Sequence, residues 1–395
     1  MILQPRMSRI ILVLLLLVIQ TIARSQTFIP GNSYFGKNNY VEYVAGNFPL
    51  IISVPHGGAL TPADIPDRKC GDETVTDSYT INLAQEIKDA IFSITGCYPH
   101  IIINNLKRIK LDANRDLNEA ACGNESAGQA WAEFHTYLDS ATANVTRKSG
   151  KGLYIDLHGH GHTIQRLELG YLLTAAQLAS NDDVLNTPTY ENYTSIKKLI
   201  QSNVLKLSHS ELLRGLSSLG AMFSAKGFPA VPSFDDRFPL TGQSYFSGGY
   251  NTERHGSKTS GTIDGIQMEC NQDVRLNDLA RKDFAVKAAE VFLDFLTKHY
   301  FPKLAETYNK PVGVEQLSLS AISLCPNPII NTLNVQNSLP VDIKIYNFLG
   351  EMIFSKKIGI NEEIDLHHLS DGIYLVTLSN GSKMLSSGKM IKASH

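Results

Sequence analysis

Short apolar segments alternate with helical patterns through roughly the first three quarters of the chain. Residues 49–54 (PLIISV) and 100–104 (HIIIN) are short and almost continuously apolar, which is typical of buried strands. Between them, residues 78–94 repeat apolar side chains at helical spacing. This alternation predicts a layered α/β domain. It continues with strands at 152–157 and 266–269 and with helices around 131–145, 196–207 and 284–295.

The period of the pattern changes in the last quarter of the chain. Residues 309–320 are polar and contain both proline and glycine, which predicts a linker. Beyond the linker, residues 341–345 and 373–378 alternate between apolar and polar side chains, as strands with one buried face do. The sequence therefore predicts an α/β domain at 26–308 and a small all-β sandwich domain at 321–395.

The N-terminus has the pattern of an export leader. Arg6 and Arg9 precede an almost wholly apolar run at 10–22, and small residues follow where a signal peptidase reads the chain. The run is shorter than the about 20 residues that a membrane-spanning helix needs. We therefore expect residues 1–25 to be a cleaved signal peptide and the protein to have no stable transmembrane anchor. An uncleaved anchor is the less favoured interpretation.

Composition narrows the class of protein further. Of the 395 residues, 43% are hydrophobic and 19% are charged, so the chain can bury a substantial core. The formal net charge is only -2 and there is no basic stripe, which argues against a nucleic-acid partner. Export permits disulfides, and the first four cysteines allow three pairings. No C-x-x-C occurs, so a thiolate zinc site is not expected. The cysteines are Cys70, Cys97, Cys122, Cys270 and Cys325.

Side chains that can bind metal follow the predicted strands. His56 comes just after one strand and before two glycines, and His158 comes at the end of another, in the run HGHGH. Asp77 precedes a predicted helix, and Glu269 is a lone carboxylate on an apolar strand. Ligands of α/β folds lie beyond the carboxyl ends of strands, and open zinc sites use imidazole and carboxylate ligands plus water. Together these residues favour a metal hydrolase.

Each of these residues also has an ordinary explanation. Asp77 could be a helix N-cap, which aspartate favours. The histidines of 158–162 could form a flexible loop, and their spacing does not say which ring binds metal. Glu269 could be a charge at a strand edge.

A basic segment follows the second predicted strand. Arg108 and Arg115 lie in the run R-I-K-L-D-A-N-R. A guanidinium can grip a carboxylate with two parallel hydrogen bonds, which lysine cannot do as well. The alternative is an ordinary surface salt bridge between Arg108 and Asp112.

Taken together, these segments resemble the N-formylglutamate amidohydrolase family. The similar segments are PHGG at 55–58, DSY at 77–79, R-x-x-x-D-x-N-R at 108–115, and GGY, RHG and Q-x-E within 248–269. They occur in the family's order over roughly residues 45–300, and D-x-N-R is also similar to aspartoacylase and zinc carboxypeptidase relatives. The resemblance implies a three-layer domain of the phosphorylase/hydrolase type, with a mixed sheet flanked by helices and one Zn²⁺. It implies His56 and His158 as zinc ligands and Asp77 as the third.

The resemblance also implies roles in catalysis and substrate binding. Glu269 would be the general base, and Arg108 would polarise the scissile carbonyl. Asn114 and Arg115 would grip a carboxylate of the substrate. Strand alternation places Gln267 on the same face as Glu269, where it could orient that carboxylate or touch the substrate.

The C-terminal residues resemble a second family. Residues 325–395 are similar to the C-terminal sorting domain of the type IX secretion system found in Bacteroidetes-type bacteria. The similar segments include LNV at 333–335, IYN at 345–347, DGIY at 371–374 and the basic end at 389–392. The resemblance implies that the type IX secretion machinery is a partner and that the protein reaches the cell surface or the medium. A generic β-sandwich adhesion module is the alternative.

Three functions remain open on the sequence. The first is a secreted zinc amidohydrolase that acts on a small, carboxylate-bearing N-acyl amino acid or peptide-like amide. The second is a zinc carboxypeptidase or cell-wall amidase on the same fold. The third is a surface binding protein that keeps the pocket without catalysis.

Overall fold

The computed structural model describes most of the chain in two compact units, Met1–Val312 and Gly313–His395. The described residues are 28–71, 73–304, 324–325, 329–335, 340–347, 350–360, 362–380 and 383–393. The predicted signal peptide at 1–25 and the predicted linker at 309–320 lie outside them.

The larger unit contains an eight-stranded mixed sheet in the order β1-β2-β4-β3-β5-β8-β6-β7. The four central strands β4, β3, β5 and β8 run parallel, and β2 and β6 join them antiparallel on either side. Parallel strands buried on both faces read as continuous apolar runs, which explains the segments seen in the sequence. The strands are β1 (Ser33–Phe35), β2 (Val41–Val44), β3 (Leu50–Val54), β4 (His100–Asn104), β5 (Gly152–Gly159), β6 (Leu167–Gly170), β7 (Ala230–Val231) and β8 (Ile263–Cys270).

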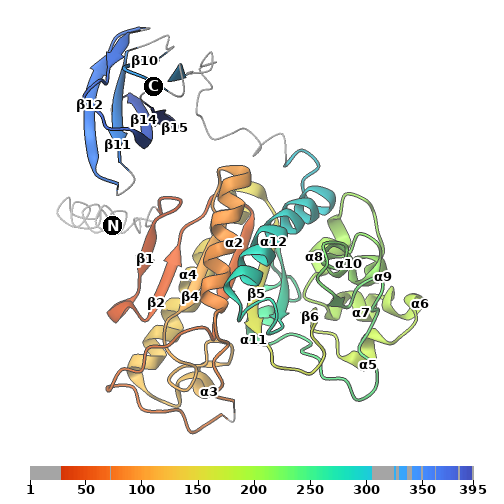
Figure 1. Ribbon diagram of the computed structural model, residues 1–395. Coiled ribbons are helices and arrows are strands. Elements are labelled where there is room, and N and C mark those ends of the chain that lie inside the picture. The colour runs from red at the N-terminus through yellow and green to blue at the C-terminus, as the bar shows by residue number, and fades with distance from the viewer. Residues whose placement is uncertain are drawn as a thin grey trace, which may run out of the picture. The chain divides into compact units, whose positions relative to one another are not determined.

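Helices cover both faces of this sheet (Figure 1). On one face α2 (Thr80–Thr95) and α12 (Asp278–His299) pack side by side, and on the other lies α4 (Glu125–Ser149). Alternation along β3 explains the two layers, because Leu50 and Ile52 join the first core and Ile51 joins the second. The predicted three-layer α/β fold class is confirmed.

Short helices fill the segment between β6 and β8, and here one expectation is wrong. The helix predicted around 196–207 is shorter: α8 (Lys197–Ser202) ends at Ser202, and the next helix, α9 (His209–Arg214), begins only after the predicted range. The Asn203 amide donates to the Leu199 and Leu207 carbonyl oxygens, and its Oδ1 accepts from Leu207 N, which ends the first helix. The remaining short helices are η1 (Lys37–Asn39), α3 (Leu117–Ala121), α5 (Ala175–Leu178), α6 (Asp182–Leu185), α7 (Pro188–Tyr193), α10 (Leu219–Ala225) and α11 (Tyr250–His255).

One disulfide joins Cys70 to Cys122. It ties the loop before α2 to the C-cap residue of α3. Cys97 and Cys270 are buried free thiols. The sequence left open three ways of pairing these four cysteines, and the described residues contain one bridge among them, Cys70–Cys122.

The smaller unit is an antiparallel β structure built from a three-stranded and a four-stranded sheet. Its core includes Val341, Ile343 and Ile345 from β11 and Val376 and Leu378 from β14, as the alternating pattern predicts. The strands are β9 (Leu324–Cys325), β10 (Thr332–Val335), β11 (Val341–Tyr346), β12 (Met352–Ile358), β13 (Glu363–Asp365), β14 (Gly372–Asn380) and β15 (Lys383–Lys392).

Within the described residues, no helix combines the length and the apolarity that crossing a membrane requires.

Candidate functional site

The carboxyl ends of three adjacent parallel strands bring the predicted site residues together. His56 follows β3 by two residues, while His158 on β5 lies directly opposite Glu269 on β8 in the strand register. Asp156 pairs in the same way with Gln267. Because neighbouring parallel strands end at the same edge, segments about 200 residues apart in the sequence face one cavity.

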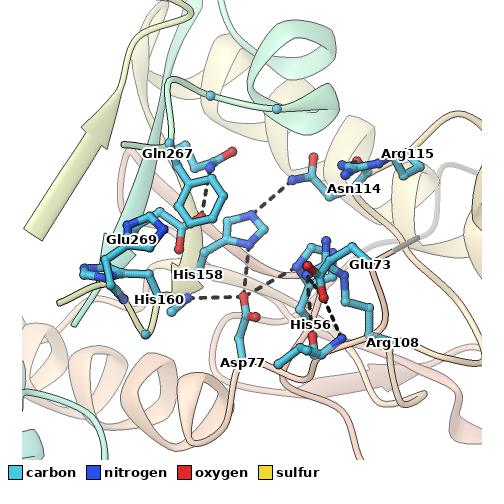
Figure 2. Close-up of a pocket in the computed structure, with 17 residues that line it drawn as sticks. His56, Glu73, Asp77, Arg108, Asn114, Arg115, His158, His160, Gln267 and Glu269 are labelled. Carbon is cyan, nitrogen blue, oxygen red and sulfur yellow. Dashed lines mark hydrogen bonds and ion pairs between the residues drawn. The ribbon is translucent and has the colours of Figure 1, made fainter. Parts of the chain in front are cut away.

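His56, Asp77 and His158 form one buried cluster, in which one ligand atom from each lies within 4.8 Å of the others. The Nδ1 atoms of both imidazoles point to the same carboxylate oxygen, Asp77 Oδ2, at 3.4 Å from His56 and 3.1 Å from His158. Figure 2 shows Asp77 between the two rings. This is the set of side chains that the sequence assigned to the metal.

Asp77 does not cap the helix that follows it. The N-cap of α2 is Tyr79, which has a left-handed backbone and makes no side-chain capping bond. Asp77 Oδ2 instead accepts from Gly159 N at 3.2 Å, and Asp77 N donates to His56 O. The carboxylate is therefore turned from the helix into the cavity.

Two further carboxylates hold the far side of each imidazole. His56 Nε2 lies 2.6 Å from Asp112 Oδ1, and His158 Nε2 lies 2.9 Å from Asp156 Oδ2. When both Nε2–H groups donate to these acids, both Nδ1 lone pairs face Asp77. His56 Nδ1 is buried and has no hydrogen-bond partner among the described residues. Carboxylate–imidazole pairs of this kind orient histidines that bind metals.

The charges around the cluster favour a cation. Burial disfavours the ionised forms of Asp77 and Asp112, yet the hydrogen bonds and charges of neighbouring histidines hold the pKa of both acids below the ordinary value. For His158, burial lowers the pKa, but the charge of Asp156 and hydrogen bonds from Asp156 and Asp77 outweigh it and raise the pKa well above normal. The buried acids therefore stabilise positive charge on His158, beside the position that a metal ion would occupy. Two nitrogen ligands and one oxygen ligand fit zinc.

Arg108 forms a buried ion pair with Asp112, and not the surface salt bridge that was the alternative from the sequence. Its Nε donates to Asp112 Oδ2 at 2.9 Å, and its Nη1 donates to Val75 O at 3.4 Å. Asp112 is 1% exposed. The same acid therefore fixes Arg108 and His56, and Arg108 lines the cavity (Figure 2).

Asn114 and Arg115 also line the cavity. Asn114 is buried; its Oδ1 accepts from Asn251 N, and its Nδ2 lies 3.3 Å from His158 Nε2. Arg115 donates from Nε to Glu119 Oε1 and from Nη1 to Asn114 O, and its side chain is 33% exposed. These bonds fix the base of the guanidinium while leaving part of it open to solvent.

Glu269 and Gln267 lie side by side on β8, which is an interior strand, so Glu269 is not an edge charge. Gln267 Nε2 donates to Glu269 Oε1 at 2.9 Å. Burial raises the pKa of Glu269 to about 8; the charge of His158 opposes this, while those of Asp77, Glu168 and Asp156 add to it. A carboxyl group with a pKa near neutrality is suited to proton transfer.

All eight predicted residues line a single cavity of about 380 Å³. Further lining residues are ones to which the sequence analysis gave no individual role. They are Glu73, Val75, Gly159, His160, Gly161, His162, Phe246, Gly248 and Gly249.

Sequence reasoning missed the two acids that hold the candidate metal ligands His56 and His158. From the sequence, Asp112 was only a possible salt-bridge partner of Arg108, and Asp156 lay without a role in the strand predicted at 152–157. Asp156 left a signal, because it lies inside an apolar strand, where a bare charge is costly, whereas Asp112 lies in the loop after β4. The flexible-loop interpretation of the histidine run is also wrong, because His158 belongs to β5 and His160 is buried, with Nε2 bonded to Arg166 O.

Comparison with solved structures finds distant similarities. The N-formylglutamate amidohydrolase from Ralstonia eutropha JMP134 is similar with a TM-score of 0.38 and 12% identity, over 67% of this chain and 95% of that one. Gene product Atu2144 from Agrobacterium tumefaciens has a TM-score of 0.40 and 14% identity, over 65% and 95%. The succinylglutamate desuccinylase from Chromobacterium violaceum has a TM-score of 0.31 and 11% identity, over 85% and 96%.

One of these solved structures is an N-formylglutamate amidohydrolase, the family that the sequence motifs resemble. No curated protein matches the chain. The function proposed below is supported by the site.

The C-terminal unit has a specific match. Residues 323–393 match the family described as "Secretion system C-terminal sorting domain". The sorting domain indicates export and a cell-surface or secreted location, as the sequence predicted.

Proposed function

We propose that the protein is an exported, zinc-dependent hydrolase that cleaves an amide bond of an N-acyl amino acid or a small peptide. One observation carries this proposal: the Nδ1 atoms of two buried histidines converge on Asp77, while separate acids hold their Nε2 atoms. His56 Nδ1, which is buried and has no hydrogen-bond partner among the described residues, supports this proposal, because its lone pair could bind a metal ion.

His56, Asp77 and His158 are the residues that would hold the zinc ion. Bound there, zinc would supply Lewis acidity and lower the pKa of a bound water toward about 7. Asp112 and Asp156 would keep both histidines in the tautomer that presents Nδ1.

Glu269 is the proposed general base. It would take a proton from the attacking water and pass it to the leaving nitrogen. Its neighbour Gln267 supports this role, because the Nε2–H donated to Glu269 Oε1 fixes the orientation of the carboxyl group. Gln267 Oε1 is buried and has no partner among the described residues, so it remains able to accept from a substrate N–H.

Arg108 and Arg115 supply positive charge to the otherwise acidic cavity. Arg108 is held by Asp112 beside the metal cluster, where it would stabilise the oxyanion of the tetrahedral intermediate. Arg115 and Asn114 would bind a substrate carboxylate, since the exposed part of the guanidinium opens into the cavity.

A zinc carboxypeptidase or cell-wall amidase would use the same groups, and the substrate distinguishes these enzymes from an N-acyl amino acid hydrolase. A binding protein without catalysis is less well supported, because the candidate base and all three candidate ligands line one cavity. We further propose that residues 26–308 form the catalytic domain and that residues 321–395 serve only as the secretion address.

The experiment that tests the proposal is an amide hydrolysis assay on the full chain. A panel of N-acyl amino acids, dipeptides and muropeptides is incubated with untreated, chelator-treated and zinc-restored protein. Hydrolysis that disappears on chelation and returns with zinc is expected for at least one compound. Binding of a panel member without hydrolysis under all three conditions would favour the binding protein.

A further inference from the structure

A buried acid outside the metal cluster positions two aromatic rings in the cavity wall. Glu168 on β6 is fully buried, and its Oε1 lies 2.8 Å from His162 Nδ1. Its other oxygen, Oε2, accepts from Phe246 N at 2.8 Å. The rings of His162 and Phe246 stack, with centroids 4.8 Å apart and an angle of 18° between their planes. One carboxylate therefore fixes both partners of the stack.

Both rings are open to the cavity. Phe246 is 43% exposed and the His162 side chain is 24% exposed, and both line the cavity beside the metal cluster. An aromatic ring held exposed inside a polar site loses the stabilisation that burial would give it. A flat apolar group of a ligand that covered the two rings would supply this stabilisation.

The stack lies on the side of the metal cluster away from Arg115. Figure 2 shows Arg115 and His160 on opposite sides of His158. The His162 ring lies 4.9 Å from the His160 ring, so the stack belongs to the His160 side. A substrate that spans the cavity would thus place a carboxylate at one end and an apolar group at the other.

His160, His162 and Glu168 also satisfy the distances of a metal cluster, but their hydrogen bonds oppose that function. His160 Nε2 donates to Arg166 O, and His160 Nδ1 accepts from His162 N, so no lone pair of this ring is free. His162 Nε2, by contrast, makes no hydrogen bond to the described residues and is available to a ligand. The cluster is better suited to hold a ring than an ion.

We propose that His162 and Phe246 form an aromatic subsite for the acyl part of the substrate. The substrate class is then N-acyl amino acids or peptides with a flat, apolar acyl group, not the formyl derivatives. This inference rests on the proposed amide hydrolysis and adds the acyl specificity. The cavity of about 380 Å³ falls within the about 300–1,000 Å³ of pockets for larger ligands, so it has room for such a group.

Aromatic stacking would make the site prefer substrates with an aromatic acyl group. Aromatic rings attract one another in offset or edge-to-face arrangements beyond the contribution of buried area. Glu168 acts as a positioning residue, because it holds His162 and the backbone of Phe246 without lining the cavity itself. Its replacement should therefore affect substrates with an aromatic acyl group more than those without one.

The test compares matched libraries of N-phenylacetyl, N-acetyl and N-formyl derivatives of the proteinogenic amino acids on the zinc-loaded full chain. We expect kcat/KM for the best phenylacetyl compound to exceed that for its acetyl and formyl counterparts by roughly tenfold or more, the scale of burying one aromatic side chain. Phe246→Ala should reduce this ratio toward one, and Phe246→Tyr should restore it. Glu168→Gln should reduce the ratio mainly by raising KM for the phenylacetyl compound.

Phe234→Ala is the matched control. The exposed fraction of Phe234 is 45%, similar to that of Phe246. Phe234 does not line the cavity, however, so its replacement should leave the ratio unchanged. A wild-type ratio near one, or a ratio that Phe246→Ala does not alter, would overturn the aromatic subsite.

A binding arm separates failure of the subsite from failure of the proposed function. Calorimetric titration of Glu269→Gln protein with the same libraries measures affinity without turnover. Hydrolysis of all three acyl classes at equal rates overturns the subsite and retains the amide hydrolase. Tighter binding of phenylacetyl compounds with no hydrolysis by the wild type overturns the hydrolase and retains the subsite. Absence of both binding and hydrolysis overturns both.

Discussion

Asp112 Oδ1 lies 2.6 Å from His56 Nε2, and this contact leaves the other imidazole nitrogen, Nδ1, facing Asp77. The other carboxylate oxygen accepts from Arg108 Nε at 2.9 Å. A single buried acid therefore sets the tautomer of one candidate ligand and the position of the candidate oxyanion-binding arginine. His158 and Asp156 repeat the first half of this arrangement on the neighbouring strand.

Replacing Asp112 by asparagine should weaken metal binding without removing a ligand. The amide is nearly the same shape but no longer provides a charged acceptor for His56 Nε2–H. We expect metal affinity to fall about 10- to 100-fold, the usual effect of losing such a partner. Competition with a chromogenic chelator measures this affinity. Asp294→Asn, on the exposed side of α12, is the control and should not change it.

Glu269→Gln should separate catalysis from folding. The substitution keeps the shape and the bond from Gln267 but removes the basic oxygen, so kcat should fall by at least roughly 10²-fold. Zinc content and melting temperature should stay close to wild type. The structural alternative, in which Glu269 only balances a nearby cation, is tested on the same sample, since it predicts lower stability and a near-normal kcat.

Arg115→Lys should act mainly on substrate binding. Arg115 is fixed by Glu119 and by the Asn114 carbonyl oxygen, and lysine cannot reproduce a two-point contact with a carboxylate. KM should rise while kcat changes little, because the contact is equal in the ground and transition states. Steady-state kinetics with a substrate and its carboxamide analogue gives the measurement. Equal turnover of the two compounds by wild-type protein would refute a carboxylate-reading role.

Stability should fall in mild acid because of a buried histidine remote from the site. Burial and the nearby Arg214 charge lower the pKa of His209 from 6.5 to about 4, against a partly opposing bond from Nδ1–H to Leu185 O. The unfolded chain then binds more protons than the folded chain between about pH 6.5 and pH 4, so stability is present above this window and is lost as the pH falls through it.

His209→Asn can retain a donor for Leu185 O and has no titrating ring. The loss of unfolding free energy between pH 7.5 and pH 5 should shrink by an amount on the order of 2 kcal/mol. Urea unfolding at the two pH values measures it. His367→Asn, at an exposed position, should leave the difference unchanged. An equal pH dependence in His209→Asn and wild type would show that His209 is not the cause.

The central parallel strands were predictable because they are buried on both faces and read as apolar runs. The strands β1, β2, β6 and β7, which lie on the two sides of these central strands, were not predictable, since each has at most four residues. The break at Asn203 was missed for a related reason: a side-chain bond to the backbone, and not a proline or glycine, ends α8.

Within the site, residue types near strand ends pointed to His56, His158 and Glu269, and the family resemblance implied roles for the other predicted members, but the partners of these residues depended on the fold. The pairing of Glu168 with His162 connects β6 to the loop after β5. Phe246 joins them from a loop that is 78 residues beyond Glu168 in the sequence. No local pattern marks such a contact, because it exists only when β6 lies beside β8 in the sheet.

The most direct test of the account is the metal content of the purified full-length protein, measured by elemental analysis together with the His56→Ala/His158→Ala double variant. The account predicts about one zinc ion per chain in wild-type protein. It predicts that the double variant retains no tightly bound zinc, since the variant keeps only one of three ligands. A double variant that binds zinc in the same amount and with the same affinity as the wild type would contradict the assignment of this cluster as the metal site.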